Sequence, residues 1–184
     1  SDAGLDDGLT QAEEIVVRAA ARASLETGTP ITTHTNALAR TGDLQVKIFE
    51  SEGLDLNKVC IGHSNDTTDI DYLSGLADKG VWLGLDTFPG GNWDSRLPDW
   101  EQRTEVVKTL IDAGYGKRIM LSHDWCVIKP WGSRAQQEQV QRRNPDGYLF
   151  VTRRVLPRLE KMGCSRKLMN QIMVDNPRRF FEGQ

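Results

Sequence analysis

The three histidines of this 184-residue chain each follow a short apolar run that is typical of a buried strand. The runs cover residues 31–33, 59–62 and 119–122, and they end at His34, His63 and His123, the last followed by Asp124. The C-terminal ends of parallel strands meet at one edge of a sheet, where α/β barrels build their active sites. Imidazoles and carboxylates suit divalent ions, so His34, His63 and Asp124 are predicted to form part of a metal site.

Helix and strand patterns alternate along the chain. A capping box formed by Thr10 and Glu13 begins an amphipathic helix that Gly28 ends. A strand is predicted at each histidine run and at residues 81–85, because these runs are short and apolar. Further helices are predicted over 43–52, from Thr68 as N-cap to near 80, over 100–113, from about 147 towards 161, and after Asn176 as N-cap. Four strand–helix units imply a parallel sheet with right-handed crossovers.

Four units are too few to close a (β/α)8 barrel, which needs eight and typically about 250 residues. The pattern alone therefore leaves two architectures open, a small open α/β sheet and half of a barrel. An isolated half-barrel would expose two parallel-sheet edges, which favour aggregation. We therefore expect further strands upstream of these residues.

The composition excludes several function classes. A net charge of −3 gives no reason to expect binding to nucleic acid or to an anionic membrane. No run approaches the length of a transmembrane helix. Three widely spaced cysteines without a CxxC pair fit reduced thiols, and no signal-peptide pattern follows Ser1. A cytoplasmic location is expected, although an upstream segment would hide an export signal.

Two connections after predicted strands are longer than packing requires, at about residues 86–99 and 125–147. Their aromatic side chains have two interpretations: they pack their own loops, or they form an apolar wall over the site. The second interpretation predicts these substrate-binding residues: Thr87, Phe88, Trp93, Trp125 and Trp131.

Several motifs resemble the phosphotriesterase family of the amidohydrolase superfamily. They are PITTHT at 30–35, IFESEGL at 48–54, VCIGHSNDT at 59–67, GLD at 84–86, SHDW at 122–125 and NPDG at 144–147. The resemblance runs from about Thr10 to Phe181 and matches the C-terminal half of the family's metal-dependent TIM barrel. It implies that residues 1–184 form strands 5 to 8 of one (β/α)8 barrel domain.

The resemblance also implies roles for single residues. His34 and His63 match ligands of the more exposed of two divalent ions, most often zinc, with manganese, cobalt or iron as alternatives. Asp124 matches the ligand of the buried ion that touches the bridging hydroxide, and Asp66 matches the carboxylate that carries the proton away. The family's HxH pair and carboxylated lysine have no counterpart here, so they are expected in an N-terminal half, with the lysine just before Ser1. His123 is not counted as a ligand, and a homodimer is expected.

The implied function is hydrolysis of a lactone, a carboxylic ester or an organophosphate triester by the metal-bridging hydroxide, once the N-terminal half is present. The alternative is a non-catalytic metal-binding or interaction fragment. Thr87 stands where many relatives carry histidine or arginine, which affects the proton relay and the substrate preference. Simpler interpretations also exist: Asp66 as the N-cap of the following helix, and Asp86 as the acceptor of a backbone amide. The second of these is favoured for Asp86.

Overall fold

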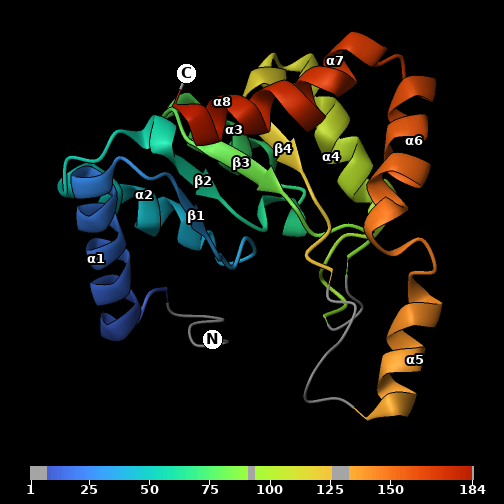
Figure 1. The fold of residues 1–184 in the computed structure, drawn as a ribbon, viewed down its shortest axis with the longest axis horizontal. Helices are drawn as coiled ribbons and strands as arrows, with labels where there is room; N and C mark the ends of the chain where they lie inside the picture. The colour runs from blue at the N-terminus through green and yellow to red at the C-terminus, as the bar shows by residue number, and fades with distance from the viewer. Residues whose placement is uncertain (1–7, 91–93, 126–132, 184) are drawn as a thin grey trace.

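The computed structural model of the chain describes residues 8–90, 94–125 and 133–183. Four parallel strands form one sheet in chain order (Figure 1). They are β1 (Ile31–Thr33), β2 (Val59–Ile61), β3 (Trp82–Leu85) and β4 (Ile119–Leu121). Each strand lies within a run that the sequence predicts, so the parallel α/β architecture is confirmed.

Helices connect the strands. They are α1 (Gln11–Thr27), α2 (Thr41–Ser51), α3 (Ile70–Asp78), α4 (Trp100–Asp112), α5 (Arg134–Arg143), α6 (Leu156–Lys161), α7 (Arg166–Asn170) and α8 (Asn176–Glu182). Of these, α2, α3 and α4 cover one face of the sheet. Successive helices contact one another from α1 through α2 and α3 to α4, and α4 contacts α6. In Figure 1 this row runs from α1 beside β1 to α6 beyond α4. No helix in the described ranges is long and apolar enough to cross a membrane.

Side chains alternate across the strands, as a pleated sheet requires. Ile61, Leu83 and Ile119 face the helices and belong to the main hydrophobic cluster. The intervening Cys60, Trp82 and Met120 form a second cluster on the opposite face, together with Phe180 of α8. The C-terminal helix therefore covers part of the face that α2, α3 and α4 leave open.

Short segments of other helix types complete the chain. The 3-10 turns are η1 (Leu56–Lys58), η2 (Ser64–Asp66), η3 (Tyr115–Lys117) and η4 (Gly147–Leu149), and the π-helical segments are η5 (Val151–Val155) and η6 (Gln171–Asp175). Each π segment runs directly into a helix whose second residue is proline, Pro157 or Pro177. Proline lacks an N–H and its ring clashes with the carbonyl four residues earlier, so a widened turn lets the helix continue through it.

Several helices differ from the sequence prediction: α2 begins at Thr41 rather than at residue 43, and α7 is not predicted. The N-cap of α3 is Asp69, whose Oδ1 accepts from the Tyr72 N–H at 3.0 Å, so Thr68 is not the cap. Helix α5 lies within the connection that the sequence pattern assigns to a loop, since its polar residues show no apolar period. Asn176 is helical and caps nothing. Its amide instead donates to the carbonyls of Gly116 and Ile119 at 2.9 and 2.7 Å.

Candidate functional site

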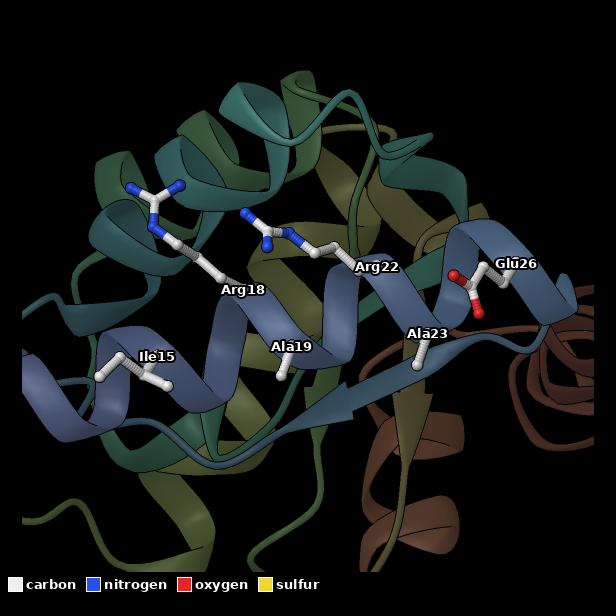
Figure 2. Close-up of a pocket in the computed structure, with 6 residues that line it drawn as sticks. All are labelled: Ile15, Arg18, Ala19, Arg22, Ala23 and Glu26. Carbon is white, nitrogen blue, oxygen red and sulfur yellow. The ribbon is translucent and has the colours of Figure 1, made fainter.

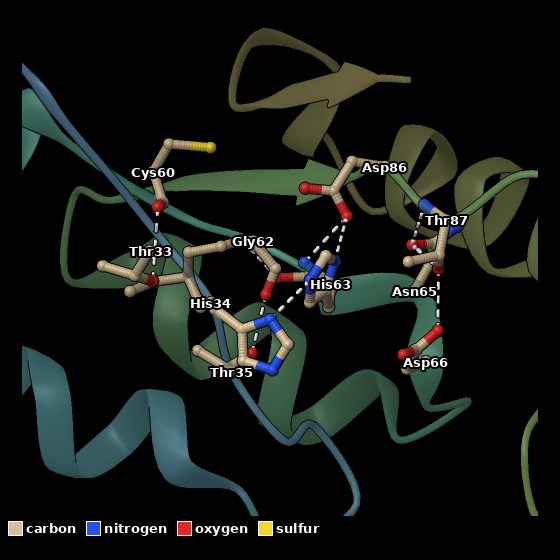
Figure 3. A network of polar contacts seen from close by, with 12 residues as sticks. Thr33, His34, Thr35, Cys60, Gly62, His63, Asn65, Asp66, Asp86 and Thr87 are labelled. Atoms are coloured by element: carbon tan, nitrogen blue, oxygen red, sulfur yellow. Dashed lines mark hydrogen bonds and ion pairs between the residues drawn. The ribbon is translucent and has the colours of Figure 1, made fainter. Parts of the chain in front are cut away.

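The loops that follow β1 and β2 bring two histidines into contact (Figure 3). Nδ1 of His34 lies 2.8 Å from Nε2 of His63, and the two rings meet edge to face at 4.5 Å between centroids. The predicted convergence of these side chains is therefore present in the structure.

Asp86, directly after β3, fixes the orientation of His63. Its Oδ1 accepts from the backbone N–H of His63 at 2.8 Å and lies 2.9 Å from the ring Nδ1. A carboxylate only accepts hydrogen bonds, so Nδ1 carries the proton and the neutral ring keeps a lone pair on Nε2. The favoured interpretation of Asp86, as the acceptor of a backbone amide, is confirmed. In addition, Asp86 orients the ring.

The backbone between β1 and β2 sets the distance between the two rings. Gly62 donates its N–H to the carbonyl of Thr33 at 3.0 Å, and a Cβ at Gly62 would lie 2.1 Å from that oxygen. The hydroxyl of Thr35 donates to the Gly62 carbonyl at 2.6 Å. His63 follows with φ of +56°, the left-handed conformation that side chains rarely adopt. The glycine therefore allows a close approach that directs His63 towards His34.

The two imidazoles differ in their electrostatic surroundings. Burial lowers the pKa of His34, and the charge of His63 lowers it further. The hydrogen bond to Asp86 raises the pKa of His63, against the effect of burial. The charges of Asp124 and Asp66 oppose the lowering at His34, whose pKa stays below its ordinary value, and they add to the raising of the pKa of His63. His34 is therefore the ring held more strongly in the neutral form, which is the form that binds metal.

The histidine pair fits a divalent ion as a partial donor set. Two nitrogens bound at 2.0–2.1 Å to a tetrahedral ion lie roughly 3.3 Å apart. The two ring nitrogens, now 2.8 Å apart, would therefore need to move only slightly apart to bind an ion between them. Among the described residues, no three histidine, cysteine or acidic side chains form a metal-binding group. Asp124 follows β4 with φ of +42°, and its charge acts on both histidine rings.

A second polar cluster lies beside the histidines and is centred on Asp66. Oδ1 of Asp66 accepts from Nη1 of Arg103 at 2.5 Å and from the hydroxyl of Thr87 at 2.7 Å. Arg103, on α4, is fully buried. Asp69, not Asp66, caps α3, so the N-cap interpretation of Asp66 is wrong.

Comparison with known proteins supplies the family. The model of the phosphotriesterase family matches residues 1–181. The chain belongs to the phosphotriesterase family. It is 37% identical over 176 residues to an aryldialkylphosphatase of Saccharolobus solfataricus, covering 96% of this chain and 55% of that relative. It is 30% identical over 187 residues to an N-acetyltaurine hydrolase of Dictyostelium discoideum, covering 97% of this chain and 48% of that relative.

A solved structure agrees with this assignment. The phosphotriesterase from Mycobacterium tuberculosis superposes with a TM-score of 0.87 at 38% identity, covering 96% of this chain and 53% of that one. This phosphotriesterase-family chain thus spans about half the length of the relatives that it matches. The four parallel strands fit part of a TIM barrel.

The predicted substrate-binding residues that the structure describes differ in burial and in contacts. Phe88 is fully buried in the main hydrophobic cluster, which leaves it no surface to present to a ligand in this conformation. The hydroxyl of Thr87 is engaged by Asn65, Asp66 and Arg103. Trp125 is partly buried, and its carbonyl accepts from the Tyr148 hydroxyl at 2.5 Å. Trp93 and Trp131 lie outside the described residues.

His123 behaves as a structural residue of this phosphotriesterase-family chain. Its Nε2 accepts from the backbone N–H of Val151 at 3.1 Å, and burial lowers its pKa. The ring thereby connects the end of β4 to η5. Leaving His123 out of the ligand set agrees with this contact.

Sequence reasoning missed Arg103 as a functional residue. The signal was present in the helical period of α4, because Arg103 lies three, four and seven residues before Val106, Val107 and Leu110. These spacings place the arginine on the apolar face of the helix. An arginine there is rarely buried unless it is paired, so its position indicates a buried partner without identifying the residue.

An open hollow of about 500 Å³ lies along α1, and Figure 2 shows the residues that line it. Its lining residues are Ile15, Arg18, Ala19, Arg22, Ala23 and Glu26. None of these is a candidate site residue, so the hollow is separate from the histidine pair.

Proposed function

We propose that the protein containing this chain is a metal-dependent hydrolase that cleaves an ester bond, and that this chain supplies strands 5 to 8 of its barrel. The observation that carries the proposal is the pair of facing nitrogens, Nδ1 of His34 and Nε2 of His63, with Asp86 fixing the second ring. A carboxylate that orients a metal-binding histidine through its other nitrogen is a common feature of metal sites.

The candidate residues have separable roles. His34, His63 and Asp124 would hold divalent ions, with zinc as the proposed metal. When bound, a pair of such ions would supply hydroxide at neutral pH and polarise the P=O or C=O bond. Asp86 keeps the proton of His63 on Nδ1, so that Nε2 stays available. Asp66 would receive the proton that hydrolysis releases and pass it to solvent.

The unpaired sheet edges and the exposed apolar residues of α1 support the proposal that further strands complete the barrel. Within the described ranges β1 and β4 each pair with a single neighbouring strand, so both sheet edges are open. On α1 the side chains of Ile15 and Val16 are 61% and 66% exposed, and Ile15 also lines the hollow of Figure 2. The relatives that match are about twice as long. We propose that their additional strands have a counterpart that packs against these surfaces.

We propose that lactones or carboxylic esters are better substrates than organophosphate triesters. Attack on either class builds charge on an oxygen that the same site polarises, so both reactions are chemically accessible. The relatives include an aryldialkylphosphatase and an N-acetyltaurine hydrolase, so similar sequences serve different substrates. We take natural esters, rather than organophosphate triesters, as the substrates on which selection has acted.

Parallel measurements on the complete protein test this assignment. The kcat/KM for a γ- or δ-lactone should exceed that for an aryl dialkyl phosphate, and Asp124→Asn should abolish both activities. A clear preference for the phosphate would overturn the lactonase assignment and leave the hydrolase assignment standing. Activity that survives in Asp124→Asn would mean that the chemistry lies elsewhere.

A non-catalytic metal-binding fragment is the second candidate. It is favoured by the observation that no three metal-binding side chains converge in the described part of the chain. Zinc titration of the 184-residue chain alone, followed by addition of the complementary half, separates the two. Weak binding that becomes tight and active on addition supports the hydrolase, whereas tight binding without hydrolysis in both samples supports the fragment.

A further inference from the structure

We infer that Arg103 and Thr87 act together as a clamp on Asp66, which fixes Oδ1 and leaves Oδ2 as the atom that takes the proton. The inference rests on the proposed function and assigns positioning residues to it. It also gives Thr87 a role different from substrate contact.

The two oxygens of the Asp66 carboxylate differ in their contacts. Oδ1 accepts from Arg103 Nη1 at 2.5 Å and from the Thr87 hydroxyl at 2.7 Å. Oδ2 accepts no hydrogen bond from any residue that the structure describes. The side chain of Asp66 remains 13% exposed, whereas that of Arg103 is 0% exposed. Oδ1 of the carboxylate is therefore held on the buried side. Oδ2 remains available to exchange a proton with a site that water reaches.

Arg103 is itself fixed by contacts on two sides. Its Nε donates to the carbonyl of Pro98 at 3.0 Å, and its Nη1 donates to the carbonyl of Asn65 at 2.6 Å. The backbone at Gly90, with φ of +97°, passes so close that a Cβ there would lie 2.7 Å from Nε. A guanidinium that is buried and bonded in this way has one position available. A buried charge without a partner is strongly destabilising, so its pairing with Asp66 restrains both side chains.

The hydroxyl of Thr87 completes the clamp. Its oxygen lies 2.5 Å from Nη1 of Arg103, 2.8 Å from Oδ1 of Asn65 and 2.7 Å from Oδ1 of Asp66. A hydroxyl has one hydrogen to donate, so these contacts use it within the cluster. We assign that hydrogen to Oδ1 of Asp66 rather than to Oδ1 of Asn65, because a charged carboxylate is the stronger acceptor. Thr87 then acts on Asp66 and not on the substrate.

Hydrolysis releases one proton, and the clamp orients the carboxylate that receives it. Water adds to the acyl carbon or to phosphorus, the bond to the leaving oxygen breaks, and the products are an acid anion, an alcohol and one proton. That proton goes to Oδ2 of Asp66 and then to solvent, which restores the carboxylate. A carboxylate that rotates freely would present either oxygen in many directions, and proton transfer depends strongly on geometry.

Thr87→Val tests the clamp in the complete protein, since valine has nearly the same shape and lacks the hydroxyl. We expect kcat to fall roughly 10–100-fold with KM unchanged, and we expect Thr87→Ser to restore kcat. The matched control is Thr104→Val, because the Thr104 hydroxyl bonds the Trp100 carbonyl within α4. A raised KM with unchanged kcat would show that Thr87 is a substrate ligand and would overturn the clamp.

A double-mutant cycle separates this inference from the proposed function. The variant with both Asp66→Asn and Thr87→Val should be no slower than Asp66→Asn alone, and bound metal should be equal in all variants. If the wild-type protein hydrolyses no ester, the proposed function fails and the unfolding midpoints decide on the clamp. Each single substitution should then lower the unfolding midpoint. The double variant should lose much less than the two single losses added together. Simple additivity in both rate and midpoint would overturn the clamp.

Discussion

One carboxylate oxygen of Asp86 holds both the main chain and the ring of His63, at 2.8 and 2.9 Å. The two contacts fix the left-handed backbone of the loop after β2 and the direction of the imidazole together. Strand β3 therefore orients a side chain that belongs to the neighbouring strand. The nitrogen that faces His34 is left without a proton in the neutral ring, which is the state that a divalent ion requires.

Removing this carboxylate should weaken metal binding. We expect Asp86→Ala to lower the affinity for zinc roughly 10–100-fold, and Asp86→Asn to have a smaller effect because its amide oxygen still accepts from Nδ1. Competition with a chromophoric chelator measures the change in the complete protein. The control is Asp78→Ala, which removes a carboxylate bonded to the Tyr115 hydroxyl. An unchanged affinity in Asp86→Ala would show that His63 is not a ligand.

A methyl group at Gly62 should separate β1 from β2. Its Cβ would lie 2.1 Å from the carbonyl of Thr33, so the strands must shift to admit it. We expect Gly62→Ala to lower the free energy of unfolding by about 1–3 kcal/mol. Gly75, within α3, has open space around its Cα, so Gly75→Ala should raise the free energy by about 1 kcal/mol. Urea denaturation of both variants measures the difference, and equal stabilities would contradict the close approach.

Much of this architecture is predictable from the sequence because it follows from local patterns. The capping box at Thr10 and the left-handed C-cap at Gly28 are both formed, since each depends on residues within one helical turn. The His34–His63 contact is predictable for a similar reason, because the ends of adjacent parallel strands must lie close together. Local spacing and strand order thus locate the candidate site.

Contacts across the chain were not predictable from these patterns. The pairing of Asp66 with Arg103 joins residues 37 positions apart, and the sequence suggested a local cap for Asp66. Asn176 failed as an N-cap for a similar reason, since the π-helical turn before it continues the helix and its amide reaches β4. In both cases a side chain that suits a helix start is used for a long-range contact. Local patterns in a single sequence do not show whether such a side chain caps a nearby helix or makes a long-range contact.

Replacing Asn176 should destabilise the junction between α8 and β4. Asn176 is fully buried and donates to the carbonyls of Gly116 and Ile119, so Asn176→Ala leaves buried acceptors without this partner. We expect a loss of about 1–3 kcal/mol in the free energy of unfolding. Asn170→Ala, at an exposed position of α7, should change stability by less than about 0.5 kcal/mol. Matching losses in the two variants would show that the buried amide contributes nothing specific.

The thiol of Cys60 should be unreactive in the folded chain. Cys60 is 3% exposed on β2, and burial raises the pKa of its thiol well above the usual value. Iodoacetamide reacts with the thiolate, so Cys60 should be alkylated only after unfolding in urea, as peptide mass spectrometry would show.

The raised pKa of the Cys60 thiol also predicts that stability depends on pH. An unfolded thiol ionises near pH 8.5 while the buried one keeps its proton, so the free energy of unfolding should fall as pH rises past that value. Cys60→Ala should reduce this decline, and an unaltered slope would assign it to other groups.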